Sequence, residues 1–412
     1  MYLSYIQQLV ADRLGGSSFF TSSEIFKFEK IKRAKRSAIK THPELPLIDL
    51  GVGEPDAIAD LEIIATLSKE ALESVNRGYA DNGIEEFKEA AVTYMNQVYG
   101  VKDLSSEGEV LHVIGSKSAY AMIPQAFINP GDFSLITVPG YPILGTMTKW
   151  LGGNTYALPL TAENHYLPDL SVIPEDICKR AKLLYLNYPN NPTGAIATAE
   201  FFEQVVAFAK KQELIVVHDA AYAALTFHGK KPLSFLSIPG AKDVGIEVQS
   251  LSKAFNMTGW RLGFIAGNAN VVKAIAAVKD NNDSGQFRAI QKAGIYALKH
   301  PELTQSTNLK YERRHNKLCS ILRNIGFQVH EPDATFYLYA KIPQGIEGGQ
   351  AFDNAEEFSQ YLIHTLLIST VPWDDAGHYV RFSVTFVAAN EEEEDAVMNE
   401  VRRRLLTCKF YF

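Results

Sequence analysis

The sequence predicts an α/β protein built on a doubly wound sheet, followed by a smaller α+β domain. Through the middle of the chain, short β-branched runs alternate with amphipathic stretches of helical length, the pattern of parallel strands joined by crossover helices. After about residue 300, longer helical segments and alternating strands replace this pattern. The chain has 412 residues, and single cores stop growing near ~250–300 residues, so two domains are expected.

Six candidate strands form the predicted sheet: Val110 to Ile114, Leu135 to Val138, Leu183 to Asn187, Leu214 to His218, Ile246 to Leu251 and Leu262 to Ala266. Between the third and the fourth, AEFFEQVVAFAKKQ places Phe202, Val205, Val206 and Ala209 at helical spacing. These three segments make a βαβ unit. Ligands of doubly wound sheets bind beyond the carboxyl ends of the strands, so residues at those ends are the candidates for a site.

The expected domain bounds are 1–50 for an N-terminal arm, 51–300 for the large domain and 301–412 for the small domain. The arm should contain one amphipathic helix around Ser23 to Ser37 and pack on the small domain, since it is too short to fold alone. In the small domain, KYERRHNKLCSILRNIG is predicted as a helix ending at Gly326, FQVH and FYLYAK as strands, and AEEFSQYLIHTLLI as a helix. The acidic run at 391–395 should form the first turns of the last helix, where the helix dipole favours negative charge.

Charge and hydropathy narrow the classes of function. Lys and Arg total 40 and Asp and Glu total 47, which gives a net charge of −7, and no basic cluster stands out beyond KIKRAKR, so no nucleic acid is expected as a partner. No apolar stretch approaches the ~20 residues of a membrane span and no signal peptide is visible, so we expect a cytoplasmic protein without a membrane partner. The three cysteines form no CxxC pair and are expected to be reduced packing residues, and no histidine spacing predicts a metal site.

The segment SLSKAFNMTGWRLGF at 250–264 follows a candidate strand and places Lys253 among Ser250, Ser252, Thr258 and Arg261. A single lysine is most often a solvated surface residue. Here, however, a partly desolvated amine beside another cation would have a lowered pKa and could form a Schiff base. The hydroxyls and the guanidinium could bind a phosphate. Pyridoxal phosphate needs both kinds of group.

Two further segments follow candidate strands. HDAAY at 218–222 places Asp219 at a strand end, where it could be a helix cap. With a pyridoxal cofactor bound, it would instead keep the pyridine nitrogen protonated so that the ring acts as an electron sink, and Tyr222 would donate to the phenolate oxygen. NYPNNPTG at 187–194 is a Pro/Gly turn in which Asn191 can donate to the same oxygen.

The chain contains NNPTG, then DxAY, then SLSK, with the arginine of GWRLG eight residues after the lysine. Together these motifs resemble the class I and II aminotransferases of fold type I, and the resemblance covers roughly Leu50 to Val387. The resemblance implies a mostly parallel seven-stranded sheet in the large domain and pyridoxal 5'-phosphate as cofactor. It implies that the catalytic residues are Lys253, Asp219 and Tyr222, with the lysine as Schiff-base former and as the base. The other implied cofactor residues are Asn191 at the phenolate oxygen, Tyr141 stacked on the ring, and Ser250, Arg261, Ser116 and the backbone of Lys117 at the phosphate.

The resemblance also implies a substrate site. HYVRFSV at 378–384 is similar to the C-terminal strand whose arginine binds the substrate α-carboxylate, so Arg381 is the candidate, with Gly53 of LGVGEPD and Asn191 beside it. A surface or interdomain salt bridge is the alternative for this arginine. Tyr79 in RGYADNG resembles the tyrosine that reaches the cofactor phosphate of the neighbouring subunit, which implies a homodimer with shared active sites. An unshared surface tyrosine is the alternative.

The segment VKDNNDSGQFRAIQKAGIYAL at 278–298 is similar to LL-diaminopimelate aminotransferases and to close relatives with alanine or broad specificity. The implied reaction exchanges amino groups between LL-diaminopimelate and 2-oxoglutarate. In lysine biosynthesis it converts tetrahydrodipicolinate to LL-diaminopimelate with glutamate as donor. The loop at Tyr79 is shorter than in plant-type enzymes, which makes Asp81 or Asn82 the nearest candidate for the group that meets the distal ammonium.

Two alternatives come from other classes of function. A pyridoxal-dependent C–S β-lyase would share the fold and the cofactor, but would release pyruvate, ammonia and a thiol without an amino acceptor. A regulatory protein on the same fold would carry a DNA-binding helix-turn-helix extension. The roughly fifty residues before LGVGEPD show no second recognition-like helix and no sustained basic face.

Overall fold

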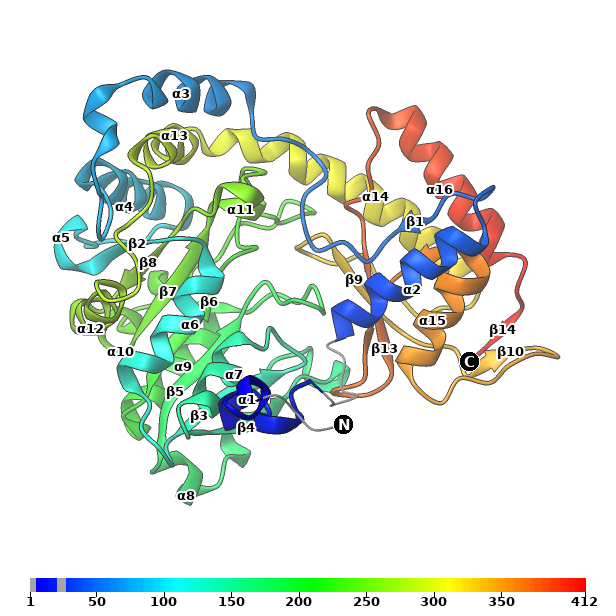
Figure 1. The fold of residues 1–412 in the computed structure, drawn as a ribbon, viewed down its shortest axis with the longest axis horizontal. Helices are drawn as coiled ribbons and strands as arrows, with labels where there is room; N and C mark the ends of the chain where they lie inside the picture. The colour runs from blue at the N-terminus through cyan, green and yellow to red at the C-terminus, as the bar shows by residue number, and fades with distance from the viewer. Residues whose placement is uncertain (1–4, 21–26) are drawn as a thin grey trace.

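The largest feature of the computed structural model, which describes residues 5–20 and 27–412, is a seven-stranded sheet (Figure 1). The strand order is β2-β8-β7-β6-β5-β3-β4, in which β8 runs antiparallel to both neighbours and the other four pairs are parallel. The predicted mostly parallel seven-stranded sheet is therefore confirmed. Its strands are β2 Val110–Val113, β3 Phe133–Val138, β4 Asn154–Pro159, β5 Ala181–Asn187, β6 Ile215–Asp219, β7 Gly245–Ser250 and β8 Gly263–Gly267.

The seventh strand, β4, is absent from the six candidate runs. It lies at the edge of the sheet and pairs with β3 alone. Only Leu158 among its residues is buried. An edge strand that faces solvent needs no continuous apolar run, so the pattern that marks the central strands is missing here.

Helices cover both faces of the sheet. Successive side chains of a strand point to opposite faces, so an apolar strand contributes to a core on each side. Leu184 and Leu186 of β5 belong to the core shared with α4, α9 and α13, whereas Leu183 and Tyr185 belong to the core shared with α6 and α12. The sheet is therefore doubly wound, as its sequence predicts. These helices are α4 Glu85–Tyr99, α6 Ser116–Phe127, α9 Ala199–Gln212, α12 Ala269–Lys279 and α13 Arg288–Lys299.

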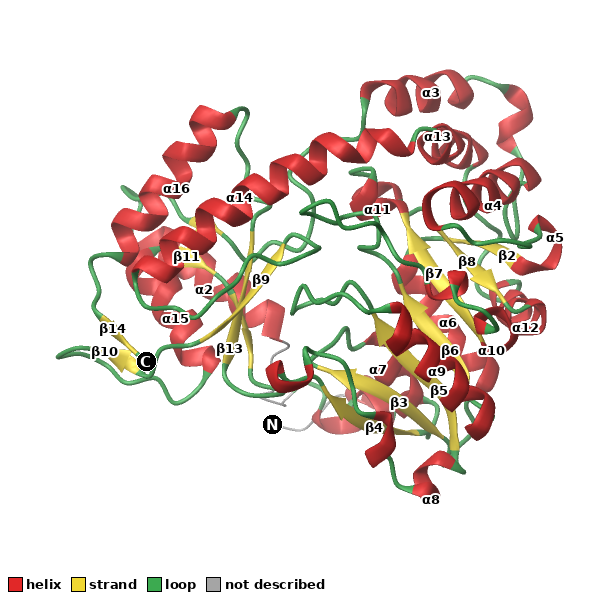
Figure 2. Ribbon diagram, turned by 180° about the vertical axis from the view of Figure 1, so that it is seen from behind, coloured by secondary structure: helices red, strands yellow, loops and turns green. Residues whose placement is uncertain are grey.

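A second lobe contains the three-stranded antiparallel sheet β12-β13-β9, formed by Val371–Trp373, Tyr379–Ser383 and Tyr337–Lys341. The long helix α14 (Thr304–Asn324) runs from the large lobe to this lobe (Figure 2). α15 (Ala355–Leu366) and α16 (Glu391–Leu405) enclose its core. The acidic run opens α16 as expected, and the side chain of Asn390 caps it by accepting a hydrogen bond from the amide of Glu393 (2.9 Å).

One predicted strand of this lobe is wrong. The residues FQVH at 327–330 are irregular, although Phe327 and Val329 are buried in the core. Alternating burial indicates which side chains point inward, but a strand also needs a neighbour for its backbone hydrogen bonds.

The N-terminal arm packs on the second lobe through α2 (Lys27–Thr41) and β1 (Ile48–Asp49). Ile31, Ala34 and Ala38 of α2 share a core with Ile363 of α15. β1 pairs in parallel with β11 (Ile368–Ser369). The expected helix around Ser23 to Ser37 is found from residue 27 onward and extends to Thr41, while residues 23–26 lie outside the described residues. The domain bounds near residues 50 and 300 stay a prediction.

The remaining elements are short or peripheral: α1 Tyr5–Gln8, α3 Leu61–Ala71, α5 Ser106–Glu109, α7 Ile143–Trp150, α8 Glu175–Cys178, α10 Ala241–Val244, α11 Leu251–Ala254, β10 Gly345–Ile346 and β14 Phe410–Tyr411. Within residues 5–20 and 27–412, no helix is both long and apolar enough to cross a bilayer.

Candidate active site

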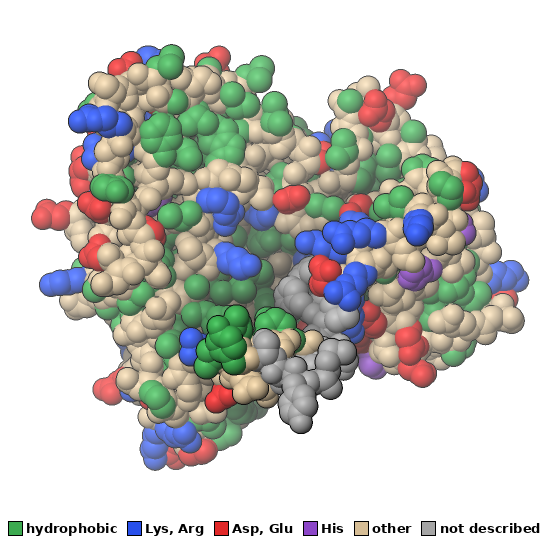
Figure 3. Space-filling view, in the orientation of Figure 1, with side chains coloured by type: hydrophobic (Ala, Val, Ile, Leu, Met, Phe, Trp, Pro, Cys, Tyr) green, Lys and Arg blue, Asp and Glu red, His purple; other side chains and the backbone are tan. Residues whose placement is uncertain are grey.

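A cavity of about 950 Å³ lies between the two lobes, beside the carboxyl ends of the parallel strands. Figure 3 shows the hollow between the lobes from one side. Residues from the large sheet, from β13 and from the arm line it together. The cavity brings together nearly all of the predicted site residues, namely Gly53, Ser116, Lys117, Tyr141, Asn191, Asp219, Tyr222, Ser250, Lys253, Arg261 and Arg381.

Lys253 lies in α11, directly after β7, where the side chain of Ser250 caps the helix by accepting from the amide of Ser252 (3.2 Å). Its Nζ donates a hydrogen bond to the carbonyl oxygen of Gly53 (2.7 Å). Burial, together with the smaller effects of the nearby guanidinium groups of Arg261 and Arg381, lowers the pKa of this amine to about 8, while the negative charge of Glu54 opposes the shift. A neutral amine, which can attack an aldehyde, is therefore accessible near neutral pH.

Asp219 is the last residue of β6 and is almost fully buried. Its Oδ2 accepts a hydrogen bond from the hydroxyl of Tyr185 (2.8 Å), and its Oδ1 accepts from the amide of Ala221 (3.1 Å). Burial raises the pKa of the carboxyl, and these hydrogen bonds oppose that effect. A desolvated carboxylate that lines a cavity is suited to a cationic ring nitrogen.

The other end of the cavity is suited to a phosphate. Ser116 begins the twelve-residue helix α6. The free backbone amides in the first turn of a helix are suited to binding an anion. The guanidinium of Arg261 packs against Gly115, and a Cβ atom at that glycine would lie 2.2 Å from Nη2 of the arginine. The glycine therefore leaves the room that the arginine occupies. Nη1 of Arg261 donates to the carbonyl of Thr258 (2.8 Å), and Ser252 lies beside it.

Arg381 lies on β13, only 2% exposed, between the rings of Tyr337 and Trp373 at 4.0 and 5.7 Å from their centroids. Its Nη1 donates to Oδ1 of Asn191 (2.9 Å) and its Nη2 to the carbonyl of Gly51 (3.1 Å). Its buried Nε has no hydrogen-bond partner among the described residues. A guanidinium held in this way is oriented for a carboxylate.

Tyr222 and Tyr337 line the same cavity as this arginine. Their hydroxyl groups lie 3.1 Å apart. A Cβ atom at position 53 would come within 3.0 Å of the hydroxyl of Tyr337 and within 3.7 Å of Nη2 of Arg381, so the absence of a side chain at Gly53 keeps this corner open.

The loop that contains Tyr79 lies away from this cavity, and the tyrosine is 79% exposed. Its carbonyl accepts hydrogen bonds from Nε and Nη2 of Arg288 (3.1 and 2.7 Å). Asn82 donates to Asp280 (2.8 Å), and the carbonyl of Asp81 accepts from the buried Lys279 (2.7 Å). Neither Asp81 nor Asn82 lines the cavity of its own chain.

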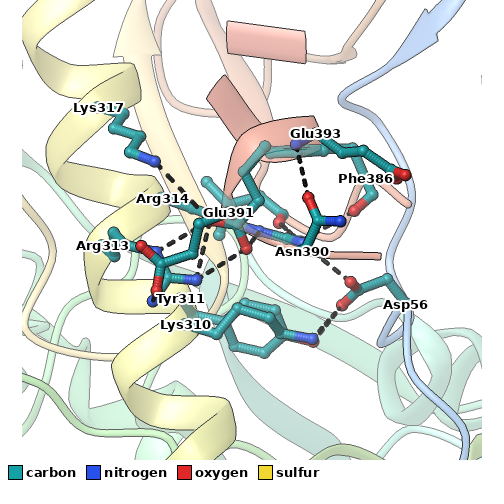
Figure 4. A network of polar contacts seen from close by, with 12 residues as sticks. Asp56, Lys310, Tyr311, Arg313, Arg314, Lys317, Phe386, Asn390, Glu391 and Glu393 are labelled. Carbon is teal, nitrogen blue, oxygen red and sulfur yellow. Dashed lines mark hydrogen bonds and ion pairs between the residues drawn. The ribbon is translucent and has the colours of Figure 1, made fainter. Parts of the chain in front are cut away.

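A buried charge network supports the loop after Gly53 (Figure 4). Nη1 of the fully buried Arg314 donates to Oδ2 of Asp56 (3.1 Å) and to the carbonyls of Val384 and Phe386 (2.8 and 2.9 Å). Its Nε donates to Glu394 of α16 (2.9 Å). The network therefore joins the loop of Gly53, the segment after β13 and the last helix.

Comparison with known families decides the class of the protein. The model of the family "Aminotransferase class I and II" matches residues 46–399. The chain belongs to this family. It is therefore a pyridoxal-phosphate-dependent aminotransferase, and the predicted family, enzyme class, fold and cofactor are confirmed.

Several proteins resemble this aminotransferase over nine tenths of its length or more. It is 60% identical to the LL-diaminopimelate aminotransferase of Methanocaldococcus jannaschii over 98% of each chain, and 55% identical to that of Methanococcus maripaludis over 99% of each. Among solved structures, substrate-bound BacF from Bacillus subtilis matches with a TM-score of 0.87 at 31% identity over 100% of both chains. The probable N-succinyldiaminopimelate aminotransferase from Thermus thermophilus matches at 0.82 and 28% identity, over 92% of this chain and 100% of that one.

The residues present in this aminotransferase are suited to pyridoxal phosphate. The amine of Lys253 has a lowered pKa, the buried carboxylate of Asp219 lines the same cavity, and Arg261 lies beside the start of α6. When bound, the cofactor supplies an electron sink for bond changes at the α-carbon of an amino acid.

Three aromatic residues of the site escaped the sequence analysis. Tyr185 contacts Asp219, while Tyr337 and Trp373 enclose Arg381. Each lies in a predicted strand or in an apolar run, where an aromatic side chain is usually a core residue. Their contacts distinguish them from other core aromatics: the hydroxyl of Tyr185 donates to Asp219, and Tyr337 and Trp373 line the cavity.

Proposed function

We propose that this enzyme transfers an amino group between LL-diaminopimelate and 2-oxoglutarate, and that in lysine biosynthesis it makes LL-diaminopimelate from tetrahydrodipicolinate with glutamate as donor. The observation that carries this proposal is the similarity, over nearly the full length of both chains, to the two LL-diaminopimelate aminotransferases described above. The cavity supports it, because an arginine for an α-carboxylate lies beside an amine suited to proton transfer.

The proposed roles of the residues follow from their places in the cavity. Lys253 holds the cofactor and moves the proton at the substrate α-carbon. Asp219 holds the ring nitrogen, with Asn191 and Tyr222 at the ring oxygen. Arg381 and the amide of Gly53 bind the α-carboxylate, with Asn191 beside them. The ring stacks against Tyr141, and the phosphate is bound by Ser116, the backbone of Lys117, Ser250 and Arg261.

We also propose that the enzyme works as a homodimer in the cytoplasm, with Tyr79 of each subunit at the phosphate of the other. This sharing is supported by the exposure of Tyr79 and by its absence from the lining of its own cavity. A tyrosine whose backbone is fixed by Arg288 while its ring remains exposed is suited to a contact outside its own chain.

A panel of amino donors and acceptors with the purified holoenzyme tests the substrate. LL- and meso-diaminopimelate, glutamate and alanine are each paired with 2-oxoglutarate. The proposal expects the LL isomer to be the preferred donor. A preference for alanine, with LL-diaminopimelate unused, would contradict the proposed substrate. It would not contradict the assignment of the cofactor site. Release of pyruvate without an amino acceptor would indicate a β-lyase.

A further inference from the structure

The N-terminal arm and the loop after β12 line one side of the cavity with four charged residues, which we call the distal wall: Lys32 and Lys35 of α2, Asp49 of β1, and Asp375 after β12. Figure 3 shows basic side chains on both sides of the hollow between the lobes. Lys35 and Asp49 form an ion pair, and their side chains are 26% and 25% exposed. This pair is therefore partly desolvated and still open to the cavity.

The ion pair is connected to the arginine of the substrate site. Oδ1 of Asp49 accepts a hydrogen bond from the amide of Gly51 (3.0 Å), and the carbonyl of Gly51 accepts one from Nη2 of Arg381 (3.1 Å). Asp49 is also fixed by the pairing of β1 with β11, in which it lies opposite Ser369. The positions of the ion pair and of Arg381 are thus set by one short stretch of backbone.

We propose that Lys35 and Asp49 bind the distal end of the substrate and determine its chemical class. The inference rests on the proposed function, since diaminopimelate has a second amino-acid group at that end. The lysine binds the distal carboxylate and the aspartate binds the distal ammonium, a role that the sequence suggests for Asp81 or Asn82, neither of which lines the cavity of its own chain. A preformed pair of opposite charges complements a group that has both charges on one carbon, and its fixed order favours one configuration of that carbon.

The same pair explains how one cavity accepts two substrates. Glutamate and 2-oxoglutarate have a carboxylate at the distal end and no ammonium. They would therefore use Lys35 alone, and the negative charge of Asp49 would weaken their binding. Lys32, which also lines the cavity, is the competing candidate for the carboxylate. Lys35 is favoured because Asp49 already holds it in place, so that less side-chain freedom is lost on binding.

Two substitutions separate this role from a purely structural one. Asp49→Asn removes the charge and keeps an oxygen for the amide of Gly51. It should raise the KM for LL-diaminopimelate about tenfold, narrow the preference for the LL over the meso isomer, and lower the KM for 2-oxoglutarate. Lys35→Met should raise the KM for both substrates about tenfold, since both lose the partner of the distal carboxylate.

The measurements use the holoenzyme with steady-state kinetics on each substrate. Calorimetric titration with glutarate, a dicarboxylate that cannot react, gives a readout that does not depend on turnover. Lys35→Met should weaken glutarate binding about tenfold and Asp49→Asn should strengthen it. The matched control is Lys30→Met on the same helix, whose Nζ lies 3.9 Å from Glu356 and which does not line the cavity. It should leave all of these constants unchanged.

Other outcomes would overturn the inference. If both variants change the KM of every substrate and the affinity for glutarate in the same direction and by similar factors, the ion pair only anchors α2 to β1. If Lys32→Met reproduces the loss and Lys35→Met does not, the distal carboxylate is bound by the other lysine. If the unmodified enzyme does not use LL-diaminopimelate, the proposed function fails, and the tests of Lys35 with glutamate, 2-oxoglutarate and glutarate still decide the role of the lysine.

Discussion

Arg381 donates a hydrogen bond from Nη1 to Oδ1 of Asn191 (2.9 Å), and this contact joins the second lobe to the large sheet inside the cavity. The oxygen of the amide is then engaged by the arginine, which leaves its NH₂ group to donate elsewhere. The residue proposed for the substrate carboxylate therefore also orients the residue proposed for the ring oxygen of the cofactor.

Arg381→Lys should lower kcat/KM about 100-fold in both half-reactions, with glutamate and with 2-oxoglutarate. An ammonium cannot form the two parallel hydrogen bonds of a guanidinium, and it would also release Asn191. Single-turnover absorbance measurements on each half-reaction test this. Arg402→Lys, an exposed position on α16, is the control. A loss confined to one substrate would show that the arginine binds something other than the shared α-carboxylate.

The attachment of pyridoxal phosphate to the apoenzyme should accelerate with pH through a midpoint of about 8, because the attacking amine of Lys253 must be neutral and burial lowers its pKa to about 8. Glu54→Gln should move the midpoint to lower pH, since the negative charge of Glu54 favours the protonated amine. Stopped-flow absorbance between pH 6.5 and 9.5 measures the rate. A rate that still rises steeply at pH 9.5 would be inconsistent with a depressed pKa.

Tyr185→Phe should lower kcat about tenfold, because one hydrogen bond to a charged group contributes about 1.5 kcal/mol. Without the hydroxyl, the carboxyl of Asp219 would have a still higher pKa and would hold a cationic ring nitrogen less well. Steady-state kinetics and a fluorescence titration of cofactor affinity test this. Tyr188→Phe is the matched control. The buried hydroxyl of Tyr188 donates to the carbonyl of Tyr166 (2.7 Å), and Tyr188 does not line the cavity. Equal effects of the two variants would assign the loss to general destabilisation.

Asp56→Ala should lower the free energy of unfolding by about 3–5 kcal/mol, because it removes one partner of a buried ion pair and leaves part of the charge of Arg314 uncompensated. Urea denaturation measures this. The control Asp333→Ala breaks an exposed pair with Lys230 (3.6 Å) and should cost no more than about 1 kcal/mol. Similar values for the two variants would show that the buried network contributes no more than a surface pair.

Mixing a Lys253→Ala subunit with a Tyr79→Phe subunit should restore activity, if each site takes its tyrosine from the partner. One site of such a heterodimer then has both residues intact. Activity of the mixture is compared with that of each variant alone. The comparison requires that the Tyr79→Phe variant alone is clearly impaired. Sedimentation that finds an active monomer at working concentration would rule out shared sites.

The central strands and the cofactor motifs could be predicted because each is a local pattern. Asp219 is the last residue of a buried strand, Asn191 and Lys253 follow two others, and the parallel order of β5, β6 and β7 brings those strand ends together. β4 and the segment at 327–330 could not be assigned correctly. The alternation of apolar and polar residues within one segment does not show whether that segment pairs with a neighbouring strand.

The distal wall could not be predicted for a different reason. Lys35 lies in a short basic run that is typical of a solvated helix face, and Asp49 precedes the glycine-containing loop by two residues. Nothing local to either segment indicates that they meet. Their contact depends on how α2 and β1 pack against the second lobe, which only the folded chain determines.

The buried contact of Arg314 with Glu394 has a consequence for the order in which the site matures during translation. Every residue proposed for the cofactor has been synthesised once Arg261 leaves the ribosome. The backbone after Arg381, in contrast, is held by Arg314, which itself depends on a glutamate in the final helix. A nascent chain can therefore assemble the phosphate end of the cavity well before its α-carboxylate end is supported, because Glu394 is synthesised long after Arg261.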